Sequence, residues 1–446
     1  MVDSPSWMTW ARARPAPPPA AAARRAHVTA VEILLFAAGV AMILIYSQCW
    51  VMAVQGDKPE ATDSSLVRAM FFPAYGCTLL ILAAGPSEVL KAWLRQPLLI
   101  LIIWVVAASW LWSINPDQTL RRAVALILTT LSGVVLAARW RWTGLAEVVA
   151  SAHALLAIGS LIAAIAFPAF GVMHKDFPGA WRGLWVEKND LGNIMTTGFC
   201  ACAAAALLAP RRARLWWPAA GLCLLLVLGS TSKTSLVACL LGVCGLLLIA
   251  ILRRGPVGKV VGTYGAVTAI VLAVGVMLVA SNVVLAALGK DATLTGRTQI
   301  WSAVMRRIQE RPWLGYGYGA VWDDTSPWGP HAWIVKQAGF TPAHSHNSWL
   351  EQWLGLGVPG LAAWALYFLE TCTRGIISLY RTPGAYLAVP FLLVYAMTSM
   401  TESIAVIFND SRWLLFVAIG VRLALPEEPA VRRPRRPAPS RALRPF

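Results

Sequence analysis

The segment His344–Glu351 has residue types that could move a proton. Ser348 and Glu351 have the spacing of a capping box, so a helix is expected to begin here. His346 then lies just before a helix N-terminus, where the positive end of the helix dipole disfavours a charged imidazolium. A neutral histidine at a water boundary can act as a general base, although a loop histidine with no chemical role is the commoner arrangement.

A metal site is the alternative use of these histidines. The rings of His344 and His346 would share one face of an extended segment, and the same loop contains His331, Asp323 and Asp324. No His-Glu-x-x-His or equivalent ligand spacing occurs, so the sequence favours a site with no metal.

Cationic residues near the same loop could bind a diphosphate. Arg182 and Lys188 belong to one short polar segment, and Arg297 lies near the start of another. A cation gains nothing from a helix N-terminus, so Arg297 is expected to have a different partner. Arg182 and Lys188 could simply anchor at the membrane interface, but two loops that each offer an arginine beside a histidine suit phosphate recognition. Lys233 is a further candidate at a span end, and it is not part of a Walker A loop because the glycines are missing.

Two patterns lie between Arg297 and His344. Ile300, Val304 and Ile308 recur every four residues, which predicts a helix with one apolar stripe. The glycine-rich run Pro312–Gly319 follows and predicts either a mobile loop or a sugar-binding surface lined by aromatic side chains.

The elements that must position these residues are membrane spans. Of the 446 residues, 58% are hydrophobic and only 13% are charged, against about 25% charged in a soluble domain. Glu402 and Asp410 flank one span end, where each could snorkel to water. Runs of sufficient length predict about twelve spanning helices and an all-α, polytopic membrane protein with no soluble catalytic domain attached. The expected spans are Thr29–Trp50, Ala69–Gly85, Pro97–Trp112, Leu120–Ala138, Leu145–Phe167, Leu191–Leu208, Leu215–Leu228, Ser235–Leu252, Val260–Leu288, Leu350–Leu369, Ala385–Met400 and Trp413–Ala424.

The charge pattern gives these spans an orientation. Arginine and lysine gather in both tails and in every second connection, which places both termini in the cytoplasm. The net charge of +17 therefore reflects membrane insertion and not a nucleic-acid partner. The tails, 1–28 and 426–446, are expected to be disordered, and the membrane domain to cover 29–425. Two longer segments, about 171–190 and 289–347, are then external.

The eight cysteines lack a Cys-x-x-Cys motif and imply neither a disulfide framework nor a zinc site.

Four motifs in order resemble the O-antigen ligase and polysaccharide polymerase superfamily of bacterial inner membranes. After His346-Asn347, nine residues precede Gly357-x-x-Gly360, which is similar to the histidine motif of the ligases. The resemblance covers roughly residues 180–405. The motifs are Trp181-Arg182-Gly183 through Lys188-Asn189-x-Leu191-Gly192, Gly296-Arg297-Thr298-x-x-Trp301, Pro312-Trp313-Leu314-Gly315-x-Gly317, and His346-Asn347.

The resemblance implies a metal-independent, inverting glycosyltransferase with a glycosyltransferase-C-like membrane fold, no cofactor and a periplasmic active site. Its donor would be an oligo- or polysaccharide on undecaprenyl diphosphate, and its acceptor a glycan or a lipid. Arg182 and Arg297 would hold the diphosphate, and His346 would take the proton of the acceptor hydroxyl. The substrate-binding residues expected beside them are Lys188, Asn189, Lys233, Asn347 and Glu351.

The motif around Lys233 bears on which member of the superfamily the chain resembles. The ligases tend to show Ser-Arg-Gly, whereas this chain has Ser230-Thr231-Ser232-Lys233-Thr234, which looks more like the exopolysaccharide polymerases. A polymerase is therefore favoured, and a ligase that joins polysaccharide to lipid A-core or a protein O-oligosaccharyltransferase stays open. The alternative from another class is a transporter or flippase of lipid-linked sugar, which would show repeats and midplane charges. Here the ionisable residues lie at span ends, which favours an enzyme.

Overall fold

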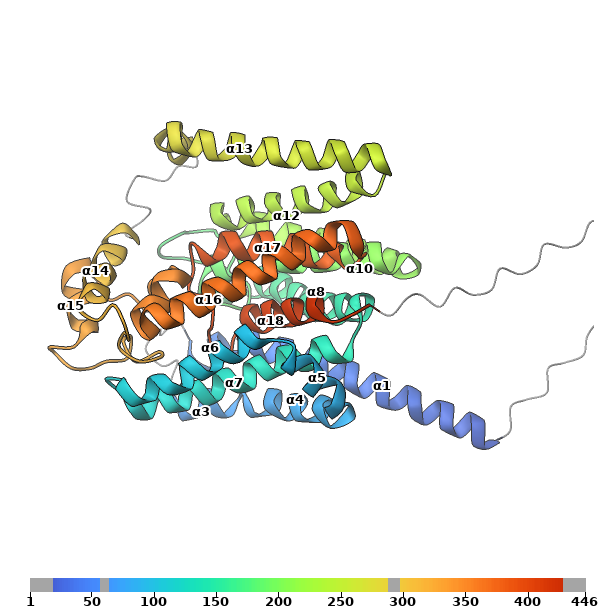
Figure 1. Cartoon of the computed structure of the whole chain (residues 1–446), viewed down its shortest axis with the longest axis horizontal. Coiled ribbons are helices and arrows are strands. Elements are labelled where there is room, and N and C mark those ends of the chain that lie inside the picture. Colours follow the sequence, from blue (N-terminus) through green and yellow to red (C-terminus); the bar gives the residue numbers. More distant parts are fainter. Residues whose placement is uncertain (1–18, 57–63, 288–296, 428–446) are drawn as a thin grey trace, which may run out of the picture.

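The computed structural model describes residues 19–56, 64–287 and 297–427, and these ranges are helical apart from connections and one isolated β-bridge between Val172 and Trp181. The long helices run side by side along a common direction, and α14 and α15 gather at one end of the bundle, here called the α14 end (Figure 1). The helices are α1 (Pro19–Tyr46), α2 (Val51–Gln55), α3 (Ser65–Ala69), α4 (Phe72–Ala84), α5 (Pro86–Leu94), α6 (Pro97–Ala108), α7 (Pro116–Arg139), α8 (Trp142–Ala166), α9 (Pro168–Gly171), α10 (Lys188–Leu208), α11 (Ala213–Gly229), α12 (Lys233–Leu252), α13 (Pro256–Ala287), α14 (Arg297–Glu310), α15 (Pro330–Ala338), α16 (Ser348–Arg381), α17 (Ala385–Ser399) and α18 (Ser411–Ala424).

The described helices confirm a polytopic, all-helical membrane protein. Nine of them are long and apolar enough to cross a membrane, and a tenth span is counted if α5 and α6, which are bent by 87°, cross together. Each expected span coincides with a helix. However, α17 and α18 have 15 and 14 residues, and such helices extend only about 21–23 Å at 1.5 Å per residue. By length, the described helices therefore provide fewer spans than the expected number of about twelve.

The N-terminal boundary differs from the expectation. α1 begins at Pro19, so residues 19–28, which the composition predicts to be disordered, are helical. A proline at the first helical position and the alanines that follow favour this earlier start. The rest of the expected disordered tails, 1–18 and 428–446, lies outside the described residues, as do 57–63 and 288–296.

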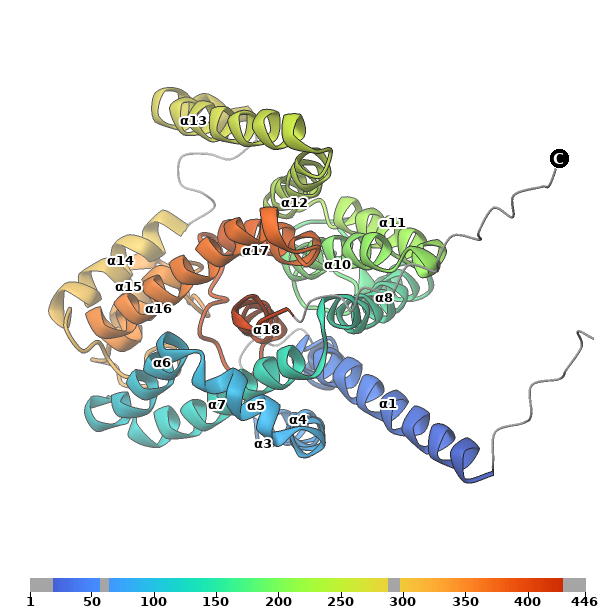
Figure 2. The same ribbon diagram turned by 45° about the vertical axis from the view of Figure 1, so that its right-hand side comes forward.

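The short helix α18 lies at the centre of the bundle (Figure 2). Trp413 and Phe416 on this helix are fully buried and pack against Trp364 of α16. α7 comes close to α18 at Gly133, where an added Cβ would lie 2.6 Å from the carbonyl oxygen of Leu414. This central position fixes the loop 400–410, which precedes α18, inside the α14 end of the bundle.

Helix α14 forms where the periodicity predicts it. Ile300, Val304 and Ile308 are buried together in a small second core at the α14 end, which confirms the apolar stripe. Leu354 of α16 belongs to the same core, so α14 is fixed against the first turns of α16.

The glycine-rich segment 312–319 is hydrogen-bonded to α16 and is not a free loop. α16 is broken at Gly357, which has φ +65°, and the break leaves nearby carbonyl groups without helical partners. The Leu354 and Gly355 carbonyls accept hydrogen bonds from the backbone N–H groups of Tyr316 (3.0 Å) and Gly317 (2.9 Å). The mobile-loop prediction is therefore wrong, because a kink in another helix supplies the partners.

Candidate active site

The histidine loop is fixed by the start of α16. The helix begins at Ser348 as predicted, but its cap is Asn347, whose side-chain oxygen accepts hydrogen bonds from the N–H groups of Trp349 (2.9 Å) and Leu350 (3.2 Å). The predicted capping box is therefore wrong, because Asn347 satisfies the free N–H groups one position earlier. His346 precedes the cap and adopts a left-handed backbone conformation with φ +50°.

Glu351, which the capping box would have used, holds the other side of the loop. Its Oε2 accepts hydrogen bonds from the backbone N–H (3.1 Å) and the hydroxyl (2.7 Å) of Ser345. Its Oε1 accepts a hydrogen bond from the Trp322 indole. Trp301 of α14 donates to the Ser345 carbonyl at 3.0 Å. Glu351 is thus a positioning residue in this structure, and its expected role in substrate binding remains a prediction.

Ser348 attaches the loop 400–410 to the same helix start. Its hydroxyl donates to the Glu402 carbonyl at 2.8 Å and accepts hydrogen bonds from the N–H groups of Ile404 (2.9 Å) and Ala405 (3.1 Å). These three bonds bring Glu402, which is 56 residues further along the chain, beside His346.

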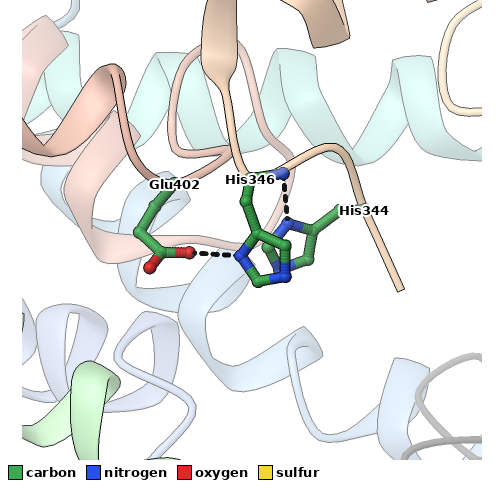
Figure 3. Close-up of side chains that lie close together, drawn as sticks. All are labelled: His344, His346 and Glu402. Atoms are coloured by element: carbon green, nitrogen blue, oxygen red, sulfur yellow. Dashed lines mark hydrogen bonds and ion pairs between the residues drawn. The ribbon is translucent and has the colours of Figure 1, made fainter. Parts of the chain in front are cut away.

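Glu402 and His346 form a hydrogen-bonded pair (Figure 3). Nδ1 of His346 lies 2.9 Å from Oε2 of Glu402. An ionised carboxylate can only accept, so Nδ1 carries the proton and Nε2 of the neutral ring is left with its lone pair. The His346 side chain is 32% exposed and Glu402 only 12%, so the pair has one face open to a substrate. A histidine oriented by a buried carboxylate is the arrangement found in catalytic triads.

Arg297 forms an ion pair with the second oxygen of the Glu402 carboxylate. Its Nη2 lies 2.8 Å from Oε1 of Glu402, and its side chain is only 13% exposed. Burial alone would raise the pKa of Glu402, but the hydrogen bond from His346 and the charge of Arg297 outweigh it and bring the pKa to about 2. The expectation that Arg297 has a partner other than the helix is confirmed, and that partner is Glu402.

His344 lies against His346, with ring centroids 4.0 Å apart. Its Nδ1 accepts a hydrogen bond from the His346 backbone N–H at 3.2 Å (Figure 3). Burial and the neighbouring His346 lower the pKa of His344 to about 3. His344 is therefore a neutral support for the loop at ordinary pH.

The side chains of His344, His346 and Glu402 also lie close enough to hold a metal ion, with one candidate ligand atom from each within 4.8 Å of the others. However, His346 and Arg297 already engage both oxygens of Glu402, and the Arg297 charge opposes a nearby cation. Among the described residues, His331, Asp323 and Asp324 do not join this cluster, and Asp323 pairs with Arg122. The donor set thus fits a hydrogen-bonded relay better than a metal centre.

The candidates Lys188, Asn189 and Lys233 come together at the starts of α10 and α12. Ser232 caps α12 and donates to Oδ1 of Asn189 at 2.9 Å. The Lys188 ammonium lies 3.4 Å from the Thr231 hydroxyl. Two cations thus stand at neighbouring helix N-termini, which is a favourable arrangement for an anionic group.

The start of α10 also lies near the histidine. Asp190 interacts electrostatically with His346 and Glu402. It also lies 3.5 Å from Arg412, which pairs with Asp410 at 2.6 Å at the start of α18. The lysine cluster and the His346–Glu402 pair therefore belong to one polar region at the α14 end.

Arg182 has a different environment. Its Nε donates to the Phe170 carbonyl at 2.8 Å, its backbone N–H donates to the Gly171 carbonyl at 2.9 Å, and the residue is only 7% exposed. These contacts give Arg182 a structural role in the loop after α9. Its assignment to the diphosphate stays a prediction.

Sequence reasoning missed Glu402 as a site residue. It was expected only to snorkel from a span end, because nothing within its own segment indicates a partner. The available signal was a lone acidic residue at the same end of the bundle as His346.

Comparisons with known proteins agree with the motifs. Residues 218–365, which include Lys233, Arg297 and His346, match the model of a family described as O-antigen ligase. The exopolysaccharide production protein ExoQ of Rhizobium meliloti (strain 1021) is 29% identical over 269 residues, covering 56% of this chain and 58% of that relative. The matched region thus spans less than two thirds of the relative's length. These findings confirm the resemblance to the O-antigen ligase and polysaccharide polymerase superfamily.

Proposed function

We propose that the protein is a bacterial inner-membrane glycosyltransferase that polymerises a glycan carried on undecaprenyl diphosphate, and that it works at the periplasmic face with both termini in the cytoplasm. The observation that carries this proposal is the chain of contacts from Arg297 through Glu402 to His346. It supplies an oriented proton acceptor next to cations, with no need for a metal.

His346 would act as the general base. Its free Nε2 takes the proton from an acceptor hydroxyl while that oxygen attacks the anomeric carbon of the donor sugar. The bond from that carbon to the diphosphate oxygen breaks, the configuration inverts, and the lipid diphosphate leaves with the electron pair. Glu402 stabilises the imidazolium that forms. Proton transfer of this kind contributes about 10²–10⁴-fold to a rate.

The developing charge on the diphosphate needs cations. Lys188 and Lys233 stand at two helix starts in the same polar region, and Asn189 can donate from its amide. Arg297 also lies near the His346–Glu402 pair, but its guanidinium already forms an ion pair with Glu402. Cations that are already in position before the reaction stabilise the negative charge that develops on the diphosphate in the transition state.

Polymerase is favoured over ligase by two observations. The segment Ser230–Thr234 has the polymerase-like form, and the curated relative is an exopolysaccharide production protein. The family model, described as O-antigen ligase, favours transfer to lipid A-core as the second candidate. Both reactions would use His346 in the same way and differ only in the acceptor.

The test is reconstitution of the purified protein in liposomes with an undecaprenyl-diphosphate oligosaccharide and a metal chelator. We expect longer glycans and released undecaprenyl diphosphate. Extension only when lipid A-core is supplied would make the protein a ligase. Movement of the donor across the bilayer without any new glycosidic bond would overturn the proposal in favour of a transporter.

A further inference from the structure

Asp190 lies on the first turn of α10, directly after Lys188 and Asn189. Among the described residues, its side chain forms one ion pair, in which Oδ1 is 3.5 Å from Nη1 of Arg412. The Asp190 side chain is 39% exposed, so its carboxylate still meets solvent. A carboxylate offers about four acceptor positions, and this long contact leaves most of them unused. Asp190 therefore has hydrogen-bonding capacity open to a ligand.

Two neighbouring carboxylates are already bound by protein side chains. Both oxygens of Glu402 have partners. Asp410 is only 5% exposed, and the Arg412 guanidinium contacts both its oxygens, with Nη2 at 2.6 Å from Oδ2 and Nε at 3.1 Å from each oxygen. Arg412 is thus fixed mainly by Asp410, and it orients Asp190 from the start of α18 without saturating it.

Asp190 adjoins both the lysine cluster and the general base. It shares the first turn of α10 with Lys188, and its charge interacts with those of His346 and Glu402. In the proposed reaction Lys188 and Lys233 bind the diphosphate, and the attacked anomeric carbon lies near His346. The sugar that carries this carbon is covalently joined to the diphosphate. This sugar therefore reaches from the lysines toward His346, past the position of Asp190.

The charge around Asp190 favours hydroxyl groups over phosphate. Glu187 precedes Asp190 by three residues, and its carboxylate interacts electrostatically with Asp190 and Glu402. A phosphate placed here, whether from the donor or from a phospholipid, would be repelled by these like charges. A sugar hydroxyl is neutral and can donate a hydrogen bond to a carboxylate. A divalent cation would instead meet the charge of Arg412, which is already in contact with Asp190.

We propose that Asp190 binds the sugar joined to the donor diphosphate by accepting a hydrogen bond from a ring hydroxyl of that sugar, which rests on the proposed function. No bond is made or broken at Asp190. The contact holds the anomeric carbon near His346 while the lysines hold the diphosphate. A site that hydrogen-bonds a substrate hydroxyl rejects a ligand that lacks it. Asp190 would thus make the site prefer the glycosylated carrier over the bare carrier lipid that the reaction releases.

The experiment measures equilibrium binding of two probes to the full chain in nanodiscs. The probes are the undecaprenyl-diphosphate oligosaccharide and undecaprenyl diphosphate without a glycan. A His346→Ala background prevents turnover, and a metal chelator removes bridging cations. Asp190→Asn keeps the size of the side chain and removes its charge, and Asp190→Ala removes the acceptor atoms. Asp176→Asn is the matched control, because Asp176 is an exposed acidic residue in the loop before α10.

The two probes should respond differently to the variants. We expect Kd for the oligosaccharide probe to rise about tenfold or more in Asp190→Ala, because a hydrogen bond to a charged group is lost. The rise should be smaller in Asp190→Asn, whose amide oxygen still accepts a hydrogen bond. Kd for the bare carrier should stay the same or fall, since a negative charge near the diphosphate has been removed, and this binding also shows that the variants are folded. Asp176→Asn should leave both Kd values unchanged.

Two results would overturn this role for Asp190. Equal weakening of both probes would show that Asp190 only shapes the diphosphate site, and unchanged binding of both probes would show that its carboxylate is merely solvated. In either case glycan extension by the wild type would leave the proposed function standing. If the wild type forms no glycosidic bond but the Asp190 variants lose affinity for the oligosaccharide probe alone, Asp190 binds the sugar and the proposed function is the part that fails.

Discussion

Glu402 joins His346 and Arg297, with Oε2 at 2.9 Å from Nδ1 of the histidine and Oε1 at 2.8 Å from Nη2 of the arginine. One buried carboxylate therefore fixes the proton acceptor and a cation in a single geometry. We predict that the charge of this carboxylate, and not only its shape, is needed for catalysis.

Replacing Glu402 by Gln tests this charge. Glu402→Gln keeps the size of the side chain but removes the negative charge that stabilises the imidazolium, so we expect kcat to fall by about 10²–10³-fold with KM little changed. Glu310→Gln is the matched control, because Glu310 pairs with Arg307 on α14 and its side chain is half exposed. Steady-state kinetics that show equal effects of the two substitutions would remove Glu402 from the mechanism.

Arg297 should keep Glu402 ionised at low pH. Arg297 helps to hold the Glu402 pKa at about 2, so its removal raises that pKa. The carboxylate of an Arg297→Ala variant then takes up a proton at higher pH than in the wild type. Infrared titration of the Glu402 carboxylate measures this, and an unchanged titration in Arg297→Ala would show that Arg297 does not act on Glu402.

His344 should make stability depend on pH. Its folded-state pKa of about 3 lies below the usual value of about 6.5. The unfolded chain thus binds more protons between these two values, and stability falls as the pH is lowered through this range. We expect the thermal unfolding midpoint in detergent to drop less from pH 7 to 5 in His344→Asn than in the wild type. Equal drops would show that His344 is accessible to protons in the folded state.

The Asn347 cap should support both stability and catalysis. Asn347→Ala leaves two N–H groups at the start of α16 without a side-chain partner, which costs about 0.5–2 kcal/mol. Because His346 is adjacent, kcat should fall as well, and Asn347→Asp should restore much of both. A kcat loss in Asn347→Ala that Asn347→Asp does not repair would indicate that the amide contacts substrate.

The sequence predicted the elements better than the contacts between them. Long apolar runs and alternating charge located every helix that reaches across the bundle, and the stripe Ile300–Ile308 was found because its periodicity is local. His346 at a helix start was also a local feature. Glu402 was not recognised, because its pairing depends on the Ser348 hydroxyl and the backbone of Ile404 and Ala405, which are far apart in the chain.

Two local predictions failed for similar reasons. Asn347 and Ser348 can both cap a helix, and only the tertiary bond of Ser348 to the loop 400–410 assigns the cap to Asn347. The mobile-loop alternative for the glycine-rich segment 312–319 is wrong because the break of α16 at Gly357, which supplies the hydrogen-bond partners, lies about 40 residues away. In each case the deciding interaction is non-local.

The most direct measurement is the rate of glycan extension by His346→Ala in proteoliposomes, with His174→Ala as the control, since His174 is exposed in the loop after α9. We predict that the rate falls about 100-fold or more in His346→Ala at unchanged donor binding, and that His174→Ala keeps the wild-type rate. Extension by His346→Ala within about twofold of the wild-type rate would contradict a general-base role for His346.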